Sequence, residues 1–385
     1  MMGETNNQGR LFHTVQIEDL VPEEHPLRRI RPLVDTERIR ELCAPLYCQD
    51  NGRPSVPPEQ LFLALLGGYL LGVRSDRKLI MELKCNMAFR WFVGLDIGSP
   101  VWDATTFSKN REHRFDASEV METLFDDTVK RAMKRGWVSQ HWSVDGTLVK
   151  ANASHKSFVP IEVYQSPGEY RKSISGEKKA DESKDSDDDP GNPTVDWKGQ
   201  KRSNQTHRST TDPDARIAKK NEKETSSPGY TVNGAMENRN RILTGIGVEI
   251  FQGPTSERKG VLNLMDRAKK RLGMNPKTVG GDKGFFESEF LEGLLERHIE
   301  PHVAAMEKGH GGFYRRARMR ARSIGFQLSQ RVRKKIEELW GEAKENHGFR
   351  RFLRRTLDNV RQEALMIGWL LNLKRLATLE ARAAT

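Results

Sequence analysis

Residues 333–344 read RKKIEELWGEAK, and they place Arg333, Glu337 and Lys344 in the spacing R-x3-E-x6-K. The segment predicts a single helix. On a helix that turns about 100° per residue, Glu337 lies roughly 40° from Arg333, and Lys344 returns to within about 20° of Glu337. One face of the helix therefore presents a carboxylate between two cations.

The apolar residues of this helix form a separate stripe, roughly 100° further round, that is expected to be buried. They are Val332, Ile336, Leu339, Trp340 and Ala343. Glu337 is placed at the margin of that buried face, where a cleft can open, whereas Glu338 and Glu342 are expected to point to solvent. If one acid on this helix does chemistry, the geometry selects Glu337.

The composition describes a chain that can bury a substantial core. It has 385 residues, of which 36% are hydrophobic, enough for one large core or two to three smaller ones. No apolar run reaches the length needed to cross a bilayer, and the N-terminal MMGETNNQGR lacks the apolar core of a signal peptide. We therefore expect a cytoplasmic protein. The three cysteines fit a reducing compartment and form no CxxC pair, so structural zinc is not expected.

The charge is strongly basic and is concentrated near the C-terminus. The formal net charge is +11, and residues 314–355 carry 14 Lys plus Arg against 4 Glu and no Asp, a surplus of 10. A solvated helix face is the usual meaning of mixed Lys and Glu. Here arginine dominates, with Arg315, Arg316, Arg318, Arg320 and Arg322 close together, and arginine suits bidentate contacts with phosphate. This pattern favours a nucleic acid as the partner.

The N-terminal part, residues 10–135, has a helical pattern. Three short helices are expected, over 61–71, 75–92 and 105–115, with Ser75 and Asp103 as caps of the second and third. The exposed positions of the third helix carry Thr106, Lys109, Asn110, Arg111 and Arg114. Such a unit resembles a helix-turn-helix, although a plain helical bundle fits the spacing equally well.

From Trp137 the pattern changes to strands alternating with helices. Strands are expected from Trp142 through Asp145 to Val149, over 230–236 and 242–251 as an antiparallel pair, and over 277–281 and 299–304 as a parallel pair. Helices are expected over 257–272, 288–297, 327–346 and 358–382. Residues 166–228 contain the charged stretch GEKKADESKDSDDDPGNP, which predicts a disordered or loop insertion.

Two acids stand at the ends of predicted strands. Asp145 and Asp282 would be held rigidly with their carboxylates beside the sheet, and Glu337 is the natural third acid. Oxygen ligands of this kind suit Mg²⁺, and two ions about 4 Å apart can activate a hydroxyl nucleophile and stabilise a leaving oxygen. Each acid also has an ordinary explanation: Asp145-Gly146 and Asp282-Lys283-Gly284 are turn sequences, and Glu337 can form surface ion pairs.

Three segments together resemble the acidic motifs of bacterial insertion-sequence DDE transposases. They are SVDGTLVKANAS (143–154), VGGDKGFFESEF (279–290) and RKKIEELWGEAK (333–344). HRSTTDPDARIAKK (207–220) and GYTVNGAMENRN (229–240) resemble sequences between the first two motifs, and TFSKNREHRF (106–115) resembles the end of the helical DNA-end-binding region. The resemblance implies an α/β fold: a ribonuclease H-like mixed sheet with flanking helices, preceded by an all-α, helix-turn-helix-like domain.

The resemblance also implies roles for individual residues. Asp145, Asp282 and Glu337 are expected to be the catalytic acids and to hold two Mg²⁺ ions, for which Mn²⁺ would substitute. Arg333 and Lys344 are expected to contact DNA near these acids. Further DNA contacts are expected from the basic residues of the third helix and the C-terminal patch, namely Lys109, Arg111, Arg114, Arg315, Arg316 and Arg318. Relatives often carry a Tyr three residues before the Arg of the last motif, where this chain has Gln330.

The expected organisation is a helical DNA-end-binding domain over 10–135 and a catalytic domain over 136–385 that contains the insertion. The expected function is a transposase that cleaves the ends of an insertion element and joins the 3′-hydroxyl to target DNA. Its partners would be double-stranded DNA (terminal inverted repeats and target) and a second copy in the synaptic complex, with no membrane, in the bacterial cytoplasm at the nucleoid. The alternatives are a structure-specific nuclease on the same fold and a DNA-binding protein without transposition activity.

Overall fold

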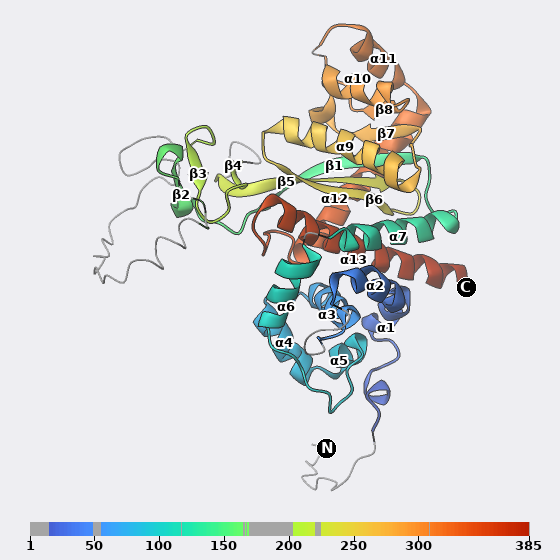
Figure 1. Ribbon diagram of the computed structural model, residues 1–385. Helices are drawn as coiled ribbons and strands as arrows, with labels where there is room; N and C mark the ends of the chain where they lie inside the picture. Colours follow the sequence, from blue (N-terminus) through green and yellow to red (C-terminus); the bar gives the residue numbers. More distant parts are fainter. Residues whose placement is uncertain are drawn as a thin grey trace, which may run out of the picture. The chain divides into compact units, whose positions relative to one another are not determined.

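The computed structural model describes residues 15–48, 55–116, 118–164, 166, 168, 203–219, 225–307 and 309–384 (Figure 1). The chain forms two compact units, one ending at Asn110 and one beginning at Arg111. No helix among the described residues is long and apolar enough to cross a membrane.

The first unit is helical, as predicted. Its helices are α1 (Pro26–Ile30), α2 (Thr36–Cys43), α3 (Pro58–Leu70), α4 (Asp76–Cys85), α5 (Met87–Val93) and α6 (Thr105–Asn110). The predicted helix over 75–92 is two helices, because the chain leaves the helical conformation at Asn86 and the side chain of Asn86 accepts a hydrogen bond from the Phe89 backbone N–H (3.0 Å). Asp103 likewise accepts from the Thr105 N–H (2.8 Å), as expected of a cap.

The second unit is built on a mixed sheet. The central strands are β1 (His141–Lys150), β5 (Ser227–Glu237), β6 (Leu243–Ile250), β7 (Thr278–Gly281) and β8 (Glu300–Val303). They lie in the order β6-β5-β1-β7-β8, antiparallel on the β5 and β6 side and parallel on the β7 and β8 side. This is the ribonuclease H-like arrangement, and it confirms the predicted fold class, including the antiparallel and the parallel strand pairs.

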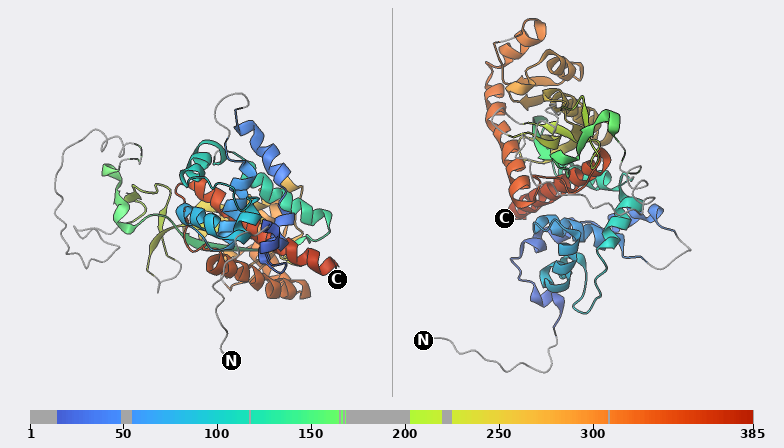
Figure 2. Two further views of the ribbon diagram at one scale, coloured as in Figure 1. Left: turned by 90° about the horizontal axis from the view of Figure 1, so that it is seen from below. Right: turned by 90° about the vertical axis from the view of Figure 1, so that its left-hand side faces the viewer.

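Helices cover both faces of this sheet. They are α7 (Val120–Lys134), α9 (Pro254–Leu272), α10 (Ser288–Glu296), α11 (Gly312–Arg320), α12 (Ile324–Asn346) and α13 (Leu357–Ala384). On β5 and β6, Gly245 lies against Leu264 of α9, whereas Gly234 lies against Trp340 of α12, so these two helices occupy opposite faces. Figure 2 shows α12 running along one side of this unit and meeting α13.

The helix α7 belongs to the second unit. It packs against α13 and α9, and Arg271 of α9 joins it through an ion pair with the buried Asp126. Arg271 also pairs with Glu119 (3.1 Å) and Glu122 (3.4 Å). The division at 110/111 therefore differs from the boundary at 135/136 expected from the sequence, because the helical pattern of α7 says nothing about which core its apolar face joins.

Part of the predicted insertion is ordered. Within 166–228, the structure has β3 (His207–Ser209), which pairs with β2 (Phe158–Pro160), and β4 (Arg216–Ala218), which pairs with the start of β5. The buried Asp212 accepts hydrogen bonds from the Tyr230 hydroxyl (2.6 Å) and the Thr356 N–H (3.0 Å). The expectation of disorder is therefore wrong for this part, whereas the stretch GEKKADESKDSDDDPGNP lies outside the described residues.

Candidate active site

Strand register brings the first two acids to neighbouring positions. In the parallel pair of β1 and β7, Ser143 lies opposite Gly280. Two residues further along each strand, Asp145 and Asp282 follow in the same register, where β7 has just ended. Because β7 ends at Gly281 while β1 continues to Lys150, Asp282 follows β7 beside the middle of β1, next to Asp145.

Asp145 is a half-buried carboxylate without a partner. No residue that the structure describes donates a hydrogen bond to it or forms an ion pair with it. Its neighbour Gly146 continues β1 opposite Asn233 rather than forming a hairpin turn. An acid that is removed from water with no compensating donor is costly, and it is the state expected of a ligand for a cation.

Asp282 has a structural role and a free carboxylate oxygen. Its Oδ1 accepts a hydrogen bond from the Gly284 N–H (2.8 Å), so it caps the short 3-10 turn Lys283–Phe285. The ordinary turn explanation from the sequence is therefore correct as far as it goes. It engages one carboxylate oxygen, and no other described residue pairs with the other one.

Glu337 is supplied by α12, as the helical spacing predicts. Ile336, Trp340 and Ala343 are buried, while the Glu337 side chain is 54% exposed at the margin of that face. Arg333 is 14% exposed, and its Nη1 lies 2.8 Å from Glu337 Oε1. The two residues are one turn apart, so the guanidinium fixes the direction of the carboxylate.

Contacts with the sheet hold α12 in place. The Trp340 ring covers Gly234 of β5, where a Cβ would be 2.5 Å from a ring carbon. The Lys344 ammonium donates a hydrogen bond to the Thr147 hydroxyl of β1, two residues beyond Asp145. Lys344 thus connects α12 directly to the strand that carries the first acid.

The charges of Asp282 and Glu337 both act on Asp145. The pKa of the Asp145 carboxyl is raised to about 7, first by burial and then by the negative charges of Asp282 and Glu337, with a smaller opposing effect from Arg333. Charges act on one another in this way only when they are close or poorly screened. The structure therefore brings together three acids that the sequence places in distant motifs.

A fourth acid, Glu257, belongs to the same neighbourhood and was not singled out from the sequence. Burial and the charge of Asp282 raise the pKa of the Glu257 carboxyl. Its side chain lies against Gly146 of β1, where a Cβ would be 2.7 Å from Glu257 Cδ. The sequence offered one weak signal, an acid at the start of a predicted helix, and that pattern is usual for favourable helix-dipole contacts.

These residues fit a divalent cation, although they do not form a finished site. Among the described residues, no three His, Cys, Asp or Glu side chains are already arranged around a common point that could hold a metal ion. The donor set is made of carboxylate oxygens, which hard cations such as Mg²⁺ and Mn²⁺ prefer over nitrogen or sulfur. Asp145 and Glu257 are both half-buried carboxylates that repel other acids nearby. A bound cation would offset the cost of their burial and of this repulsion.

Gln330 takes a structural role at the position where relatives often carry Tyr. Its amide nitrogen donates to the carbonyl oxygens of Gly281 (3.1 Å) and His302 (2.5 Å), at the ends of β7 and β8. The side chain therefore ties the start of α12 to the sheet directly beside Asp282.

The basic residues of α11 divide into two groups. Arg316 pairs with Glu300 of β8 (2.7 Å), and Arg318 donates to the carbonyl oxygens of Met306 and Gly309 and lies over the Phe286 ring. Arg315, in contrast, forms no ion pair or side-chain hydrogen bond with the described residues. It lines a shallow surface cavity with Arg318, Met319 and Arg322.

The basic residues near position 110 lie at the division between the two units. Lys109 is exposed on α6, in the first unit. Arg111 and Arg114 are half-buried in the π-helical turn Arg111–Phe115, which begins the second unit. Their contact with DNA remains a prediction.

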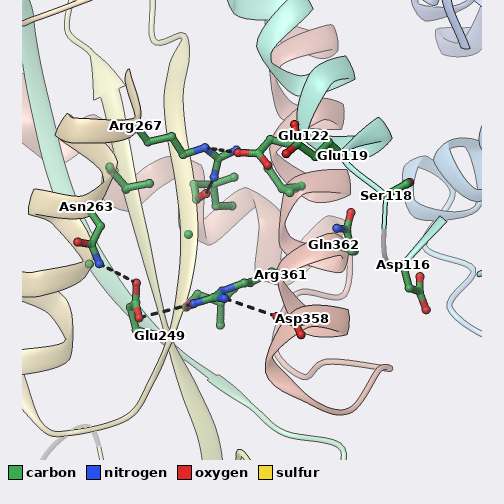
Figure 3. A pocket seen from close by; sticks show the side chains of 16 residues that line it. Asp116, Ser118, Glu119, Glu122, Glu249, Asn263, Arg267, Asp358, Arg361 and Gln362 are labelled. Carbon is green, nitrogen blue, oxygen red and sulfur yellow. Dashed lines mark hydrogen bonds and ion pairs between the residues drawn. The ribbon is translucent and has the colours of Figure 1, made fainter. Parts of the chain in front are cut away.

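A second cavity of about 520 Å³ lies away from these acids, between β6 and helices α7, α9 and α13 (Figure 3). Arg267 pairs with Glu122 across it (2.7 Å), and Arg361 lies between Glu249 (3.9 Å) and Asp358 (3.6 Å). The lining contains more carboxylates than arginines, which disfavours a nucleic acid there. Its ion pairs join α9 to α7 and α13 to β6, the edge strand of the sheet.

Sequence comparison agrees with this geometry. Residues 15–113 match the family described as Transposase domain (DUF772), and residues 185–373 match the family described as Transposase DDE domain. The chain belongs to the DDE transposases. No curated protein matches the sequence.

The family matches cover the transposase unevenly. The DDE match contains Asp282 and Glu337 but begins after Asp145, so only the strand register and the charge interactions join the first acid to the other two. Two solved structures are weakly similar to this transposase. A Mos1 transposase paired-end complex with left transposon end has 9% identity over 78% of this chain and 82% of that one (TM-score 0.20), and a pre-cleavage Mos1 transpososome has 10% over 84% and 80% (TM-score 0.18). Likeness at this level supports no argument about this transposase.

Proposed function

We propose that this transposase cleaves DNA at the ends of an insertion element and joins the freed 3′-hydroxyl to target DNA, with divalent cations held by Asp145, Asp282 and Glu337. One observation carries the proposal: a half-buried Asp145 that lacks a partner and feels the charges of both other acids. In the absence of a cation this arrangement costs folding free energy, and a bound cation would offset that cost.

The residues divide the work according to their positions. Asp145, in the middle of β1, and Asp282, directly after β7, are held by the sheet and would hold the cations, while Glu337 would complete the ligand set from α12. The Arg333 guanidinium orients Glu337 and, being planar and always charged, suits a nearby phosphate as well. When bound, Mg²⁺ or Mn²⁺ supplies activation of the attacking oxygen and stabilisation of the leaving oxygen. This ligand set calls for no protein nucleophile.

The cleavage reaction is tested with Asp282→Asn, which keeps the shape of the side chain and an oxygen that can accept from Gly284. A labelled duplex that carries the candidate element end is incubated with Mg²⁺ or Mn²⁺, and binding is measured beside cleavage. We expect DNA binding to persist and cleavage to fall by at least 10²-fold. Equal cleavage by the variant and the parent would remove Asp282 from the mechanism.

Strand transfer distinguishes the proposal from its nearest alternative, a nuclease on the same fold. A pre-cleaved end with a free 3′-hydroxyl is incubated with a supercoiled plasmid and Mg²⁺, and a 3′-deoxy end serves as the matched control. Covalent joining of the 3′-hydroxyl end alone is expected. Nicking of the plasmid without joining would favour the nuclease, and no cleavage of any DNA with either ion would favour a binding protein without catalysis.

DNA binding through the basic surface follows from the surplus of positive charge in residues 314–355. Because each neutralised phosphate releases counterions, the logarithm of affinity falls with the logarithm of salt concentration. Arg315→Gln should reduce that slope by about 1. Arg316→Gln is the control, since its guanidinium is engaged by Glu300. An unchanged slope for Arg315→Gln and for the triple variant at 315, 316 and 318 would exclude the patch.

The working assembly should contain more than one copy. Joining two element ends requires two sets of acids in one complex, so a dimer on paired ends is the simplest assembly, formed at the bacterial nucleoid where the DNA is. Light scattering of the protein with and without end duplexes measures this directly. A single copy bound to two ends would contradict it.

A further inference from the structure

We propose that Glu257, in the first turn of α9, is a fourth carboxylate ligand of the divalent-cation site. The proposal rests on the proposed function, because it needs the cation that Asp145, Asp282 and Glu337 would hold. It goes beyond the three acidic motifs, since Glu257 lies outside all of them.

The contact with Gly146 is the first observation. A Cβ at position 146 would lie 2.7 Å from both Cγ and Cδ of Glu257 and 3.0 Å from its Oε1. The two carbon distances are shorter than a Cβ contact allows, so any side chain at position 146 would displace the Glu257 carboxylate from where it lies on the strand. The carboxylate therefore lies against the backbone of β1 at the residue that follows Asp145, on the face of the strand that packs on α9.

The start of α9 is also tied to the second acid. Arg258, the next residue, donates through Nη1 to the Gly284 carbonyl oxygen (3.2 Å), and the Gly284 N–H donates to Asp282 Oδ1 (2.8 Å). The turn that carries Asp282 is thus joined to the first turn of α9 by two consecutive hydrogen bonds. Glu257 is placed between the Asp145 strand and the Asp282 turn.

Glu257 has no other task within the described chain. It is half-buried, and no described residue donates a hydrogen bond to it or forms an ion pair with it. An acid in the first turn of a helix is ordinarily exposed, where the dipole stabilises it at no cost in hydration. Here the carboxylate is turned inward against a strand, toward other acids, which is unfavourable until a cation lies among them.

Glu257 and Glu337 lie on opposite faces of the sheet. Gly146 faces α9, whereas Asp145 and Thr147 alternate to the face where α12 contributes Glu337 and Lys344. Glu337 and Glu257 therefore approach the strand edge from opposite sides of the sheet. Ligands that reach past the end of β7 from both faces of the sheet would enclose a cation beside β1.

The test is Mn²⁺ binding by the full-length, metal-free protein without DNA, measured by the electron paramagnetic resonance signal of free Mn²⁺. The variants are Glu257→Gln, Asp282→Asn as the positive control, and Glu292→Gln, an exposed acid on α10, as the matched control. We expect Glu257→Gln to weaken Mn²⁺ binding at least tenfold, Asp282→Asn to weaken it as much or more, and Glu292→Gln to leave it unchanged.

The outcomes separate this inference from the proposed function. If Asp282→Asn weakens binding and Glu257→Gln does not, the fourth ligand is excluded and the three-acid site stands. If neither variant changes binding, both proposals fail. Should Glu257→Gln be poorly folded, Gly146→Ala provides a second route, because the added methyl displaces the Glu257 carboxylate while keeping its charge. It too must weaken Mn²⁺ binding at least fivefold, and unchanged binding by a folded Gly146→Ala would overturn the inference.

Discussion

Asp145→Asn should stabilise the metal-free transposase, although it removes an acid that the proposed reaction needs. Raising the pKa of a carboxyl from 3.8 to about 7 costs about 4 kcal/mol of folding free energy above pH 7. Asparagine removes that charge but still buries a polar amide, which returns part of the gain. We expect a net stabilisation of about 1–3 kcal/mol at pH 8, a rise in melting temperature of about 2–4 °C per kcal/mol.

The pH dependence of this effect has a definite sign. Because burial raises the pKa of Asp145 in the folded state, the penalty is absent below pH 3.8 and grows as the pH rises through about 7. The advantage of Asp145→Asn should therefore be full at pH 8 and shrink steadily as the pH is lowered toward 4. Scanning calorimetry in EDTA measures it and separates the transitions of the two units.

Divalent cations should reduce the stability advantage of the variant. Mg²⁺ that binds the folded parent stabilises it by about 1.4 kcal/mol at ten times the dissociation constant, and the variant gains less. Glu292→Gln, at an exposed position, should melt like the parent in every condition. If Asp145→Asn melts at or below the parent temperature in EDTA at pH 8, Asp145 is not the strained, unpartnered acid that the geometry describes.

Three further predictions concern how the site is supported. Gly234→Ala places a methyl 2.5 Å from the Trp340 ring, so it should cost about 1–3 kcal/mol in chemical unfolding and reduce cleavage by shifting α12; a neutral effect would contradict the close contact. Glu342→Gln should lower stability by under 1 kcal/mol at neutral pH, with the loss vanishing as the pH falls from 4.5 to about 2, because the folded-state pKa of Glu342 is lowered to about 2. Arg271→Met should cost about 3–5 kcal/mol because it leaves the buried Asp126 without its cation, and a cost below 1 kcal/mol would show that this ion pair does not hold α7.

The prediction for Glu342 depends on its position at the junction of α12 and α13. The His347 ring, whose Nε2 lies 3.8 Å from Glu342 Oε1, is the main cause that lowers the pKa of the Glu342 carboxyl, and a hydrogen bond from Lys374 of α13 adds to it. The sequence placed this acid in solvent, since its angle on the helix points away from the apolar stripe. The angle is correct, but α13 covers part of that side.

The sequence predicts the strands and helices of the second unit well, because the patterns that indicate them are local. Apolar residues in β-rich runs predict the individual strands. A strand, a helix and a second strand in succession form a right-handed crossover between parallel strands, which predicts the parallel pairing of β7 and β8. Asp145 and Asp282 could be chosen because each follows an apolar, strand-like run; Asp282 does follow β7, whereas Asp145 lies within β1, which continues to Lys150. Their neighbouring register could not be read from the sequence, since it depends on how β1 and β7 align in space.

The failures come from contacts that join distant segments. The strands β3 and β4 are three residues each, too short for a periodic signal, and they are held by Asp212, whose partners are Tyr230 and the backbone of Thr356. Glu257 was missed for a related reason, because its meaning depends on Gly146 of another element. Arg318 is a similar case. Its guanidinium donates to backbone carbonyl groups of Met306 and Gly309, which lie outside its own helix and cannot be identified as partners from the sequence.

The most direct test is anomalous diffraction from crystals of the full-length protein grown or soaked with Mn²⁺. The proposed site predicts Mn²⁺ peaks bonded to carboxylate oxygens of Asp145, Asp282 and Glu337 at the edge of the sheet between β1 and β7. Mn²⁺ bound elsewhere, or a saturated crystal whose three carboxylates coordinate no ion, would contradict it.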